Sequence, residues 1–124
     1  MTRRRERVGI MKLKIGWKKY TIIKKKKPKM GKELVNGSID SDALEIQIEK
    51  SLPTEVQQQV LIHEVIHGIF NHAGKQEWFK NEELVDCISN GIMQVIYDNE
   101  TNIFEKIGAK HGSKKNTNRK NKRV

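Results

Sequence analysis

Two histidines four residues apart, His63 and His67, constrain this chain more than any other feature of its sequence. They interrupt the apolar stretch 60–70, and Glu64 directly follows the first of them. If the stretch is a helix, residues four apart lie on one face, so both imidazoles can bind the same cation. This is the H-E-x-x-H arrangement, which supplies two zinc ligands and a general base. Two unconnected histidines on a surface helix are the less favoured interpretation, because burying these polar side chains without a metal is costly.

Charge is distributed unevenly along the sequence. Residues 1–32 carry fourteen lysines and arginines against one acid, and residues 108–124 carry seven basic residues and no acid. Residues 33–107 carry four basic residues against fourteen acids, so the segment with the histidines is acidic although the net charge is +10. We therefore expect the basic termini to make at most non-specific contacts with nucleic acid.

The length of 124 residues suits one small domain with tails. We expect a basic disordered arm over 1–10, a metallopeptidase domain over 11–107 and a basic disordered tail over 108–124. The single cysteine, Cys87, excludes a disulfide within the chain and indicates a reducing compartment. We expect Cys87 to be a small buried residue rather than a metal ligand. Without an apolar run typical of a signal or a membrane span, the prediction is a cytoplasmic monomer that does not contact membranes.

Alternating apolar residues predict the strands. Leu13, Ile15 and Trp17 alternate with polar residues, and a bend or bulge at 18–19 is expected to shift the phase for the next stretch. The lysine cluster at 24–29 is interpreted as a solvated loop rather than a nucleic-acid patch, because no aromatic residues interleave it. The pair Asn36-Gly37 marks a turn or a bulge within a strand. Residues 44–49 alternate strictly and predict a strand whose polar outer face suits an edge or a one-sided sheet.

Two helices are predicted after these strands. The first should run over 55–70, with a capping box formed by Thr54 and Gln57 and an end near Gly74. The second should run over 81–97 and bury an apolar stripe at spacings of three and four, formed by Leu84, Val85, Ile88, Ile92, Val95 and Ile96. The predicted fold class is α+β, with a small antiparallel sheet of about three strands packed on two helices that meet at a metal site.

A catalytic zinc takes three protein ligands and leaves the fourth position to water, so a third ligand is needed. At the start of the second helix the chain resembles the gluzincin metallopeptidases, whose second helix carries N-E-x-x-x-D. Asn81, Glu82 and Asp86 match that pattern. The resemblance implies that Glu82 is the third ligand and that Asp86 accepts a hydrogen bond from a ligating histidine.

Two other residues remain alternatives for the third ligand. At about 100° per residue, Glu82 lies at the rim of the apolar stripe, whereas Glu83 lies almost opposite it. Glu83 therefore ranks second. His72 ranks third, because it follows His67 by five residues where the metzincin pattern requires six.

The stretch 11–99 is also similar to very small zincins encoded by phages and integrated mobile elements. The shared features are a basic hairpin, a G-x-I-D turn, an alternating strand and L-I-H-E-x-x-H, here with the turn at 37–40 and the last motif at 61–67. These proteins are related in style to the ImmA/IrrE metallopeptidases, which cleave DNA-bound repressors. The SprT-like proteases of DNA–protein crosslinks are a second relative. The resemblance implies a minimal zincin-like fold, and a phage-encoded protein would act in the host cytoplasm.

Motif and resemblance together predict a zinc metallopeptidase of the gluzincin type that hydrolyses peptide bonds of a cytoplasmic protein. One Zn²⁺ per chain is expected, with Glu64 activating a zinc-bound water. The edge of strand 44–49 is expected to hold the substrate as an added strand. The alternatives are another zinc hydrolase, or a metal-containing nucleic-acid-associated binding protein of a phage or mobile element with no protease activity. A general base at Glu64 argues against the binding protein, because a structural metal has no use for one.

Overall fold

The computed structural model of the chain describes residues 11–30, 33–100 and 102–108. They belong to two units that divide between Met93 and Gln94, and each unit is described by itself. The predicted basic arm, and residues 109–124 of the predicted tail, lie outside the described residues.

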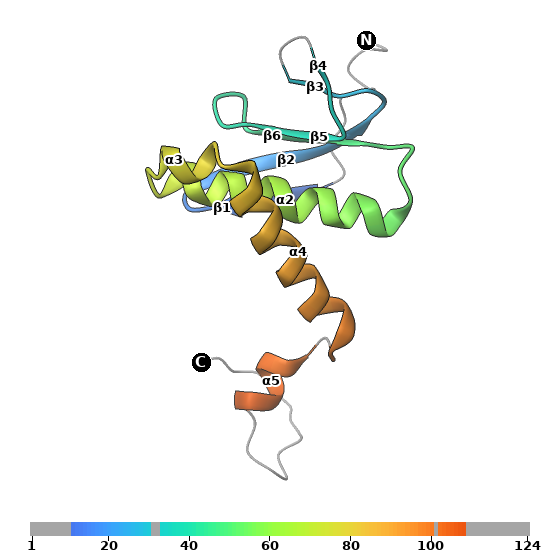
Figure 1. Ribbon diagram of the computed structural model, residues 1–124, viewed down its shortest axis with the longest axis vertical. Helices are drawn as coiled ribbons and strands as arrows, with labels where there is room; N and C mark the ends of the chain where they lie inside the picture. The colour runs from blue at the N-terminus through green and yellow to red at the C-terminus, as the bar shows by residue number, and fades with distance from the viewer. Residues whose placement is uncertain (1–10, 31–32, 101, 109–124) are drawn as a thin grey trace. The chain divides into compact units, whose positions relative to one another are not determined.

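The described part of the first unit contains six strands, which are β1 (Met11–Ile15), β2 (Lys18–Lys25), β3 (Lys29–Met30), β4 (Glu33–Leu34), β5 (Gly37–Asp40) and β6 (Glu45–Glu49). Four of them form a sheet with the order β1-β2-β6-β5, and β3 pairs with β4 separately (Figure 1). The outer pairs β1–β2 and β5–β6 are antiparallel, whereas the central strands β2 and β6 run parallel.

The α+β fold class is confirmed, and the main sheet has four strands where about three were expected. Residues 37–40 were expected to form a turn, but they form β5 and pair with β6. A turn follows β5, where the Asp40 carboxylate accepts the backbone N–H groups of Asp42 and Ala43. Leu44 completes it with a φ of +60°. Strand β6 pairs with both β5 and β2 and lies inside the sheet, so of the two settings expected for 44–49 the edge is wrong.

The first two strands form a hairpin rather than one strand with a bulge. The register pairs Ile15 with Lys18, so Gly16 and Trp17 are the two turn residues. Gly16 adopts a φ of +61°, which favours glycine and allows a two-residue hairpin turn. Trp17 therefore does not continue the inward face of β1, and its side chain is 72% exposed.

Helix α2 (Thr54–His72) carries both histidines of the motif. Its end is as predicted, since Gly74 has a φ of +75° and the Lys75 N–H bonds the Phe70 carbonyl. The predicted capping box is wrong. Thr54 makes no capping bond, and the Gln57 amide donates instead to the carbonyls of Lys50 and Leu52.

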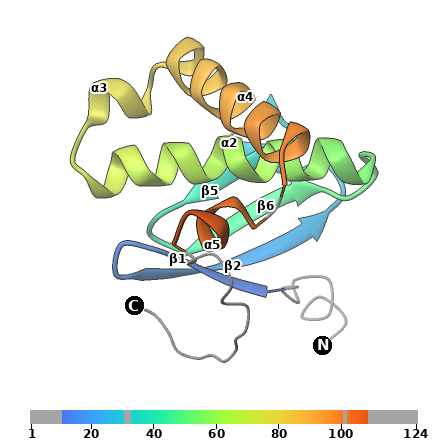
Figure 2. The same ribbon diagram turned by 90° about the horizontal axis from the view of Figure 1, so that it is seen from below.

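The core lies between α2 and one face of the four-stranded sheet (Figure 2). Its fully buried members come from β1, β2 and β6, and Val60, Leu61 and Val65 of α2 pack against them. Gly68 lets α2 approach closely, because a Cβ there would lie 2.8 Å from side-chain atoms of Ile15 and Ile39.

Two further helices follow in the chain, α3 (Gln76–Phe79) and α4 (Glu82–Asp98). Asn81 caps α4, because its side-chain oxygen accepts the Leu84 N–H at 3.0 Å. The predicted apolar stripe is buried only near the start of α4, at Val85, whereas Ile92 is exposed. Cys87 is exposed, so the prediction that it is buried is wrong.

The second unit, as far as it is described, contains the last residues of α4, including exposed Val95 and Ile96, and α5 (Ile103–Gly108). An ion pair joins Lys106 to Glu100. Helix α5 includes Gly108, where the disordered tail was expected to begin. Among the described residues, no helix combines the length and apolar character needed to cross a membrane.

Candidate metal centre

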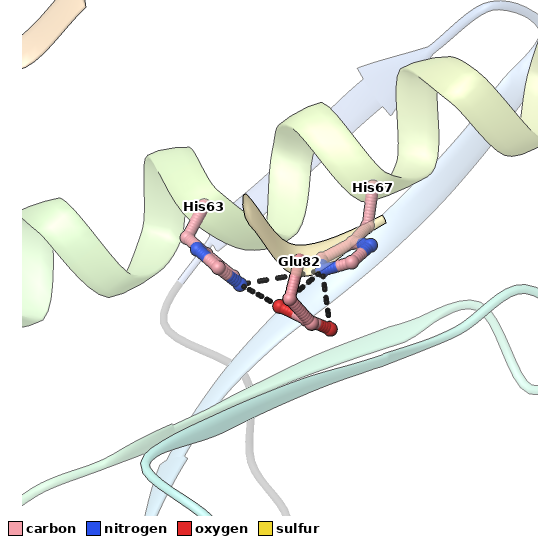
Figure 3. A group of neighbouring side chains, drawn as sticks. All are labelled: His63, His67 and Glu82. Atoms are coloured by element: carbon pink, nitrogen blue, oxygen red, sulfur yellow. Dashed lines mark hydrogen bonds and ion pairs between the residues drawn. The ribbon is translucent and has the colours of Figure 1, made fainter. Parts of the chain in front are cut away.

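The side chains of His63, His67 and Glu82 converge on one point between α2 and the start of α4 (Figure 3). The Nε2 atoms of the two histidines lie 3.2 Å apart. The Glu82 carboxylate approaches His63 Nε2 at 3.1 Å and His67 Nε2 at 3.2 Å. One ligand atom from each residue lies within 4.8 Å of the others, so the group could hold a metal ion.

The other ring nitrogen of each histidine faces a hydrogen-bond acceptor. His63 Nδ1 lies 3.0 Å from a carboxylate oxygen of Asp86, and His67 Nδ1 lies 2.7 Å from the backbone carbonyl of Phe79. Both contacts favour a proton on Nδ1, which leaves the Nε2 lone pair facing the centre. The partners thus fix both the ring orientation and the tautomer that a metal ligand needs.

The donor set of this centre fits a cation. With both Nδ1 atoms protonated, the two Nε2 atoms and the Glu82 carboxylate are all acceptors that face one another at close range. A cation between them would replace the repulsion of their lone pairs by attraction. Two imidazoles and one carboxylate are also the ligand types that zinc takes in catalytic sites.

Glu64 lies beside this group but is not part of it. Its side chain is buried, and within the described residues it forms no hydrogen bond and no ion pair. Burial, and secondarily the negative charge of Glu82, raise the pKa of the Glu64 carboxyl to about 7. A buried carboxyl without a partner is costly in an ordinary core, so this environment points to a functional role.

A cleft of about 760 Å³ opens over the centre. His63, Glu64, His67, Glu82 and Asp86 all line it, and the remaining wall is largely apolar. Apolar side chains come from the hairpin β3–β4, β5, α2 and the segment before α4; they include Met30, Val35, Ile39, Val56, Val60 and Phe79. The space suits an extended ligand with apolar side chains more than a small polar ion alone.

Strand β5 forms the sheet edge nearest the centre. One of its edges pairs with β6, and Gly37 and Ile39 of β5 also line the cleft. A Cβ on Gly37 would lie 2.3 Å from Val60 Cγ1 and 3.4 Å from Glu64 Cγ, so glycine lets β5 approach α2 this closely beside Glu64. Strand 44–49 was expected to offer the edge for a substrate, but it is β6 and lies inside the sheet.

The two alternative third ligands lie outside the group. Glu83 is exposed on α4 and is not among the three residues that could share an ion. The ring of His72 lies against Gly16, where a Cβ would be only 2.2 Å from the imidazole. His72 therefore packs on the turn of the β1–β2 hairpin and is not part of the group formed by His63, His67 and Glu82.

Two contributors to the site have no signal in the sequence motifs. The Phe79 carbonyl that holds His67 is a backbone group, and it is placed by α3, a short helix absent from the predicted elements. The apolar pair Trp78-Phe79 between the two predicted helices was the only hint of it. Gly37 carried a turn signal, and its close contact with Glu64 depends on a strand pairing distant in sequence.

Comparison with known proteins adds no neighbour from which a function could be transferred. No protein-family model, no curated protein and no solved structure matches this chain. What the centre can do is therefore inferred from the chemistry of its own residues.

Proposed function

We propose that this protein is a zinc-dependent metalloendopeptidase that hydrolyses peptide bonds of a protein substrate. One observation carries the proposal: a His-His-Glu group lies beside a buried, unpartnered carboxyl at the base of a cleft bordered by a sheet edge. Each of these parts has a use in peptide hydrolysis. A purely structural metal site needs neither the carboxyl nor the cleft.

The zinc would be held by His63, His67 and Glu82, which leaves one coordination position free in a tetrahedral site. When bound, it would supply Lewis-acid chemistry, polarising a carbonyl and lowering the pKa of a water. Asp86 and the Phe79 carbonyl keep the two imidazoles in the required tautomer.

Glu64 is the proposed general base. Its carboxylate accepts a proton from the attacking water and later delivers that proton to the leaving amine. Burial favours this exchange, because a carboxyl with a raised pKa gives its proton up and takes it back near neutral pH. The cation would favour the ionised form before the reaction begins.

The edge of β5 is the proposed substrate platform. A peptide added along it would form backbone hydrogen bonds and lie in the cleft with Glu64 and the two histidines. This placement favours an extended segment of a protein over a compact small molecule.

The test combines zinc analysis with a peptidase assay on three variants. Wild-type protein should contain one zinc per chain and cleave members of a proteome-derived peptide library, detected by mass spectrometry. Glu64→Gln should keep its zinc and lose activity by about 10²- to 10⁴-fold, because only the base is removed. Glu82→Gln should lose both zinc and activity.

Glu83→Gln is the matched control for Glu82→Gln, because it removes the adjacent carboxyl on the same turn of α4. It should keep both zinc and activity. If wild-type protein binds zinc but cleaves nothing, the proposed function is wrong and the metal is structural. If Glu64→Gln remains fully active, Glu64 is not the general base.

A further inference from the structure

We propose a second binding surface, independent of the metal centre, on the β1–β2 hairpin. This surface, called here the basic ribbon, consists of Lys12, Lys14, Lys19 and Trp17. We infer that it binds single-stranded nucleic acid, with the lysines on the phosphates and Trp17 stacked on a base. The inference does not rest on the proposed peptidase activity.

The strand register places the three lysines on one face of the sheet. Lys14 pairs directly with Lys19, and Lys12 pairs with Thr21, to whose hydroxyl its Nζ donates at 2.9 Å. The alternate residues Leu13, Ile15 and Tyr20 point to the core under α2. All three lysines are exposed on the opposite face.

The pairing of Lys14 with Lys19 is unfavourable unless an anion is present. Like charges directly opposite each other destabilise an antiparallel pair. Within the part of the chain that the structure describes, none of the three lysines forms an ion pair that would offset this. Residues 11–30 contain nine lysines and no acid, so no carboxylate of the hairpin itself can do so.

Trp17 adds an aromatic platform at the end of the ribbon. It is 72% exposed in the hairpin turn, and the Lys18 ammonium lies 5.4 Å from its ring centroid. Exposure of so large an apolar side chain is unfavourable in water. Base stacking on exposed aromatic side chains, next to lysines that follow the backbone, is the usual mode for single strands.

The charge of the surroundings confines such a ligand to the hairpin. Residues 33–93 of the same unit carry three lysines against eleven acids, and Asp40 lies at the far edge of the same sheet face. A polyanion would therefore follow β1 and β2 and be repelled from the acidic region of the metal centre. A membrane surface fits less well, because apart from Trp17 the ribbon face offers lysines and Thr21 rather than several apolar side chains.

The experiment uses the full chain with Trp78→Phe, which leaves Trp17 as the single tryptophan. Fluorescence of Trp17 is titrated with oligo-dT and oligo-U of roughly twenty nucleotides, across a range of salt concentrations, and with anionic phospholipid vesicles. The two oligonucleotides separate DNA from RNA binding. Far-UV circular dichroism confirms that each variant is folded.

We expect both a quench of Trp17 by an oligonucleotide and a marked salt dependence. In Lys12→Gln/Lys14→Gln/Lys19→Gln, affinity should fall about tenfold at moderate salt, and the slope of log K against log salt should decrease by about 2, since each phosphate contact contributes about 0.7. In Trp17→Ala, measured by fluorescence anisotropy of a labelled oligonucleotide, affinity should fall about five- to hundredfold with the slope unchanged.

Lys50→Gln/Lys75→Gln/Lys106→Gln is the charge-matched control, because these exposed lysines lie outside the hairpin. Retained affinity there supports the basic ribbon. An equal loss in the control would overturn the proposal in favour of net charge alone. Binding to vesicles without binding to either oligonucleotide, or binding that leaves Trp17 fluorescence unchanged, would overturn it as well.

Discussion

At the scale of single residues, Asp86 shows how a side chain outside the His-His-Glu group can orient one of its members. Its carboxylate lies 3.0 Å from His63 Nδ1 and fixes the tautomer in which Nε2 faces the centre. We predict that Asp86→Asn weakens zinc affinity by about 10- to 100-fold without abolishing binding. Competition with a chromogenic chelator measures this. Unchanged affinity in Asp86→Asn would mean that His63 needs no partner to hold its orientation.

Glu49 is a second residue whose environment affects the whole chain, because its hydrogen bonds make stability depend on pH. Its carboxylate accepts bonds from the Ser51 hydroxyl at 2.7 Å and from the N–H groups of Lys27 and Ser51 at 2.6 and 3.0 Å. These bonds, the Ser51 hydroxyl first, hold the pKa of Glu49 below its ordinary value of 4.5. The carboxylate thereby fastens the lysine-rich loop to the end of β6.

We predict that Glu49→Gln lowers the free energy of unfolding at neutral pH and that the difference from wild type shrinks below about pH 4.5. A lowered folded-state pKa means that the stabilisation is present above the unfolded pKa and is lost as the pH falls through the folded one. Urea denaturation at neutral and acidic pH measures it. Glu33→Gln, which alters an exposed carboxyl in β4, is the control and should show no such trend.

At the scale of elements, the β1–β2 turn docks on the last turn of α2 through Gly16 and His72. We predict that Gly16→Ala is destabilising for two reasons, a φ of +61° that costs alanine about 1–2 kcal/mol and a clash with the imidazole 2.2 Å from the new Cβ. In a His72→Ala background only the first cost remains. Urea denaturation of wild type, the two single variants and the double variant gives the coupling free energy between Gly16→Ala and His72→Ala. Additive effects would mean that the two residues do not touch.

Sequence periodicity predicted the elements whose signal is long and local. The helix over 54–72, the helix over 82–98 and the strand over 45–49 were all expected within a few residues of their ends. The α+β class followed from their order. The 3.6-residue period also favoured Glu82 over Glu83 as the residue that faces the histidines, and the Glu82 carboxylate lies against both of them.

Periodicity failed where backbone conformation or distant pairing decides the structure. Trp17 continues the alternation of Leu13 and Ile15, but the positive φ of Gly16 reverses the chain there. The parallel pairing of β2 with β6 joins segments about twenty residues apart, and no local pattern encodes it. That pairing moves β6 into the sheet and leaves β5 as the edge beside the centre.

At the scale of the whole molecule, the metal centre joins elements that the small core holds together only in part. The candidate centre takes two side chains from α2 and one from the start of α4. The Gln59 amide also donates to the Asn90 side chain between these helices at 2.5 Å. With apolar residues at 35% of the sequence, the core is modest for its chain length. A ligand that binds only the folded state adds its binding free energy to stability.

We therefore predict that zinc raises the thermal midpoint of unfolding and that a chelator lowers it. At a free zinc concentration about a thousandfold above the dissociation constant, the gain should be about 4 kcal/mol. Glu82→Gln should lose most of this gain, because it removes a ligand, whereas Glu64→Gln should keep it.

Glu64→Gln should also melt higher than wild type when both are metal-free, because it replaces a buried, unpartnered carboxyl. Scanning calorimetry with and without chelator measures all three effects. Equal midpoints for wild type with and without zinc would show that the three side chains do not clamp an ion. A lower metal-free midpoint for Glu64→Gln would show that the Glu64 carboxyl stabilises the fold.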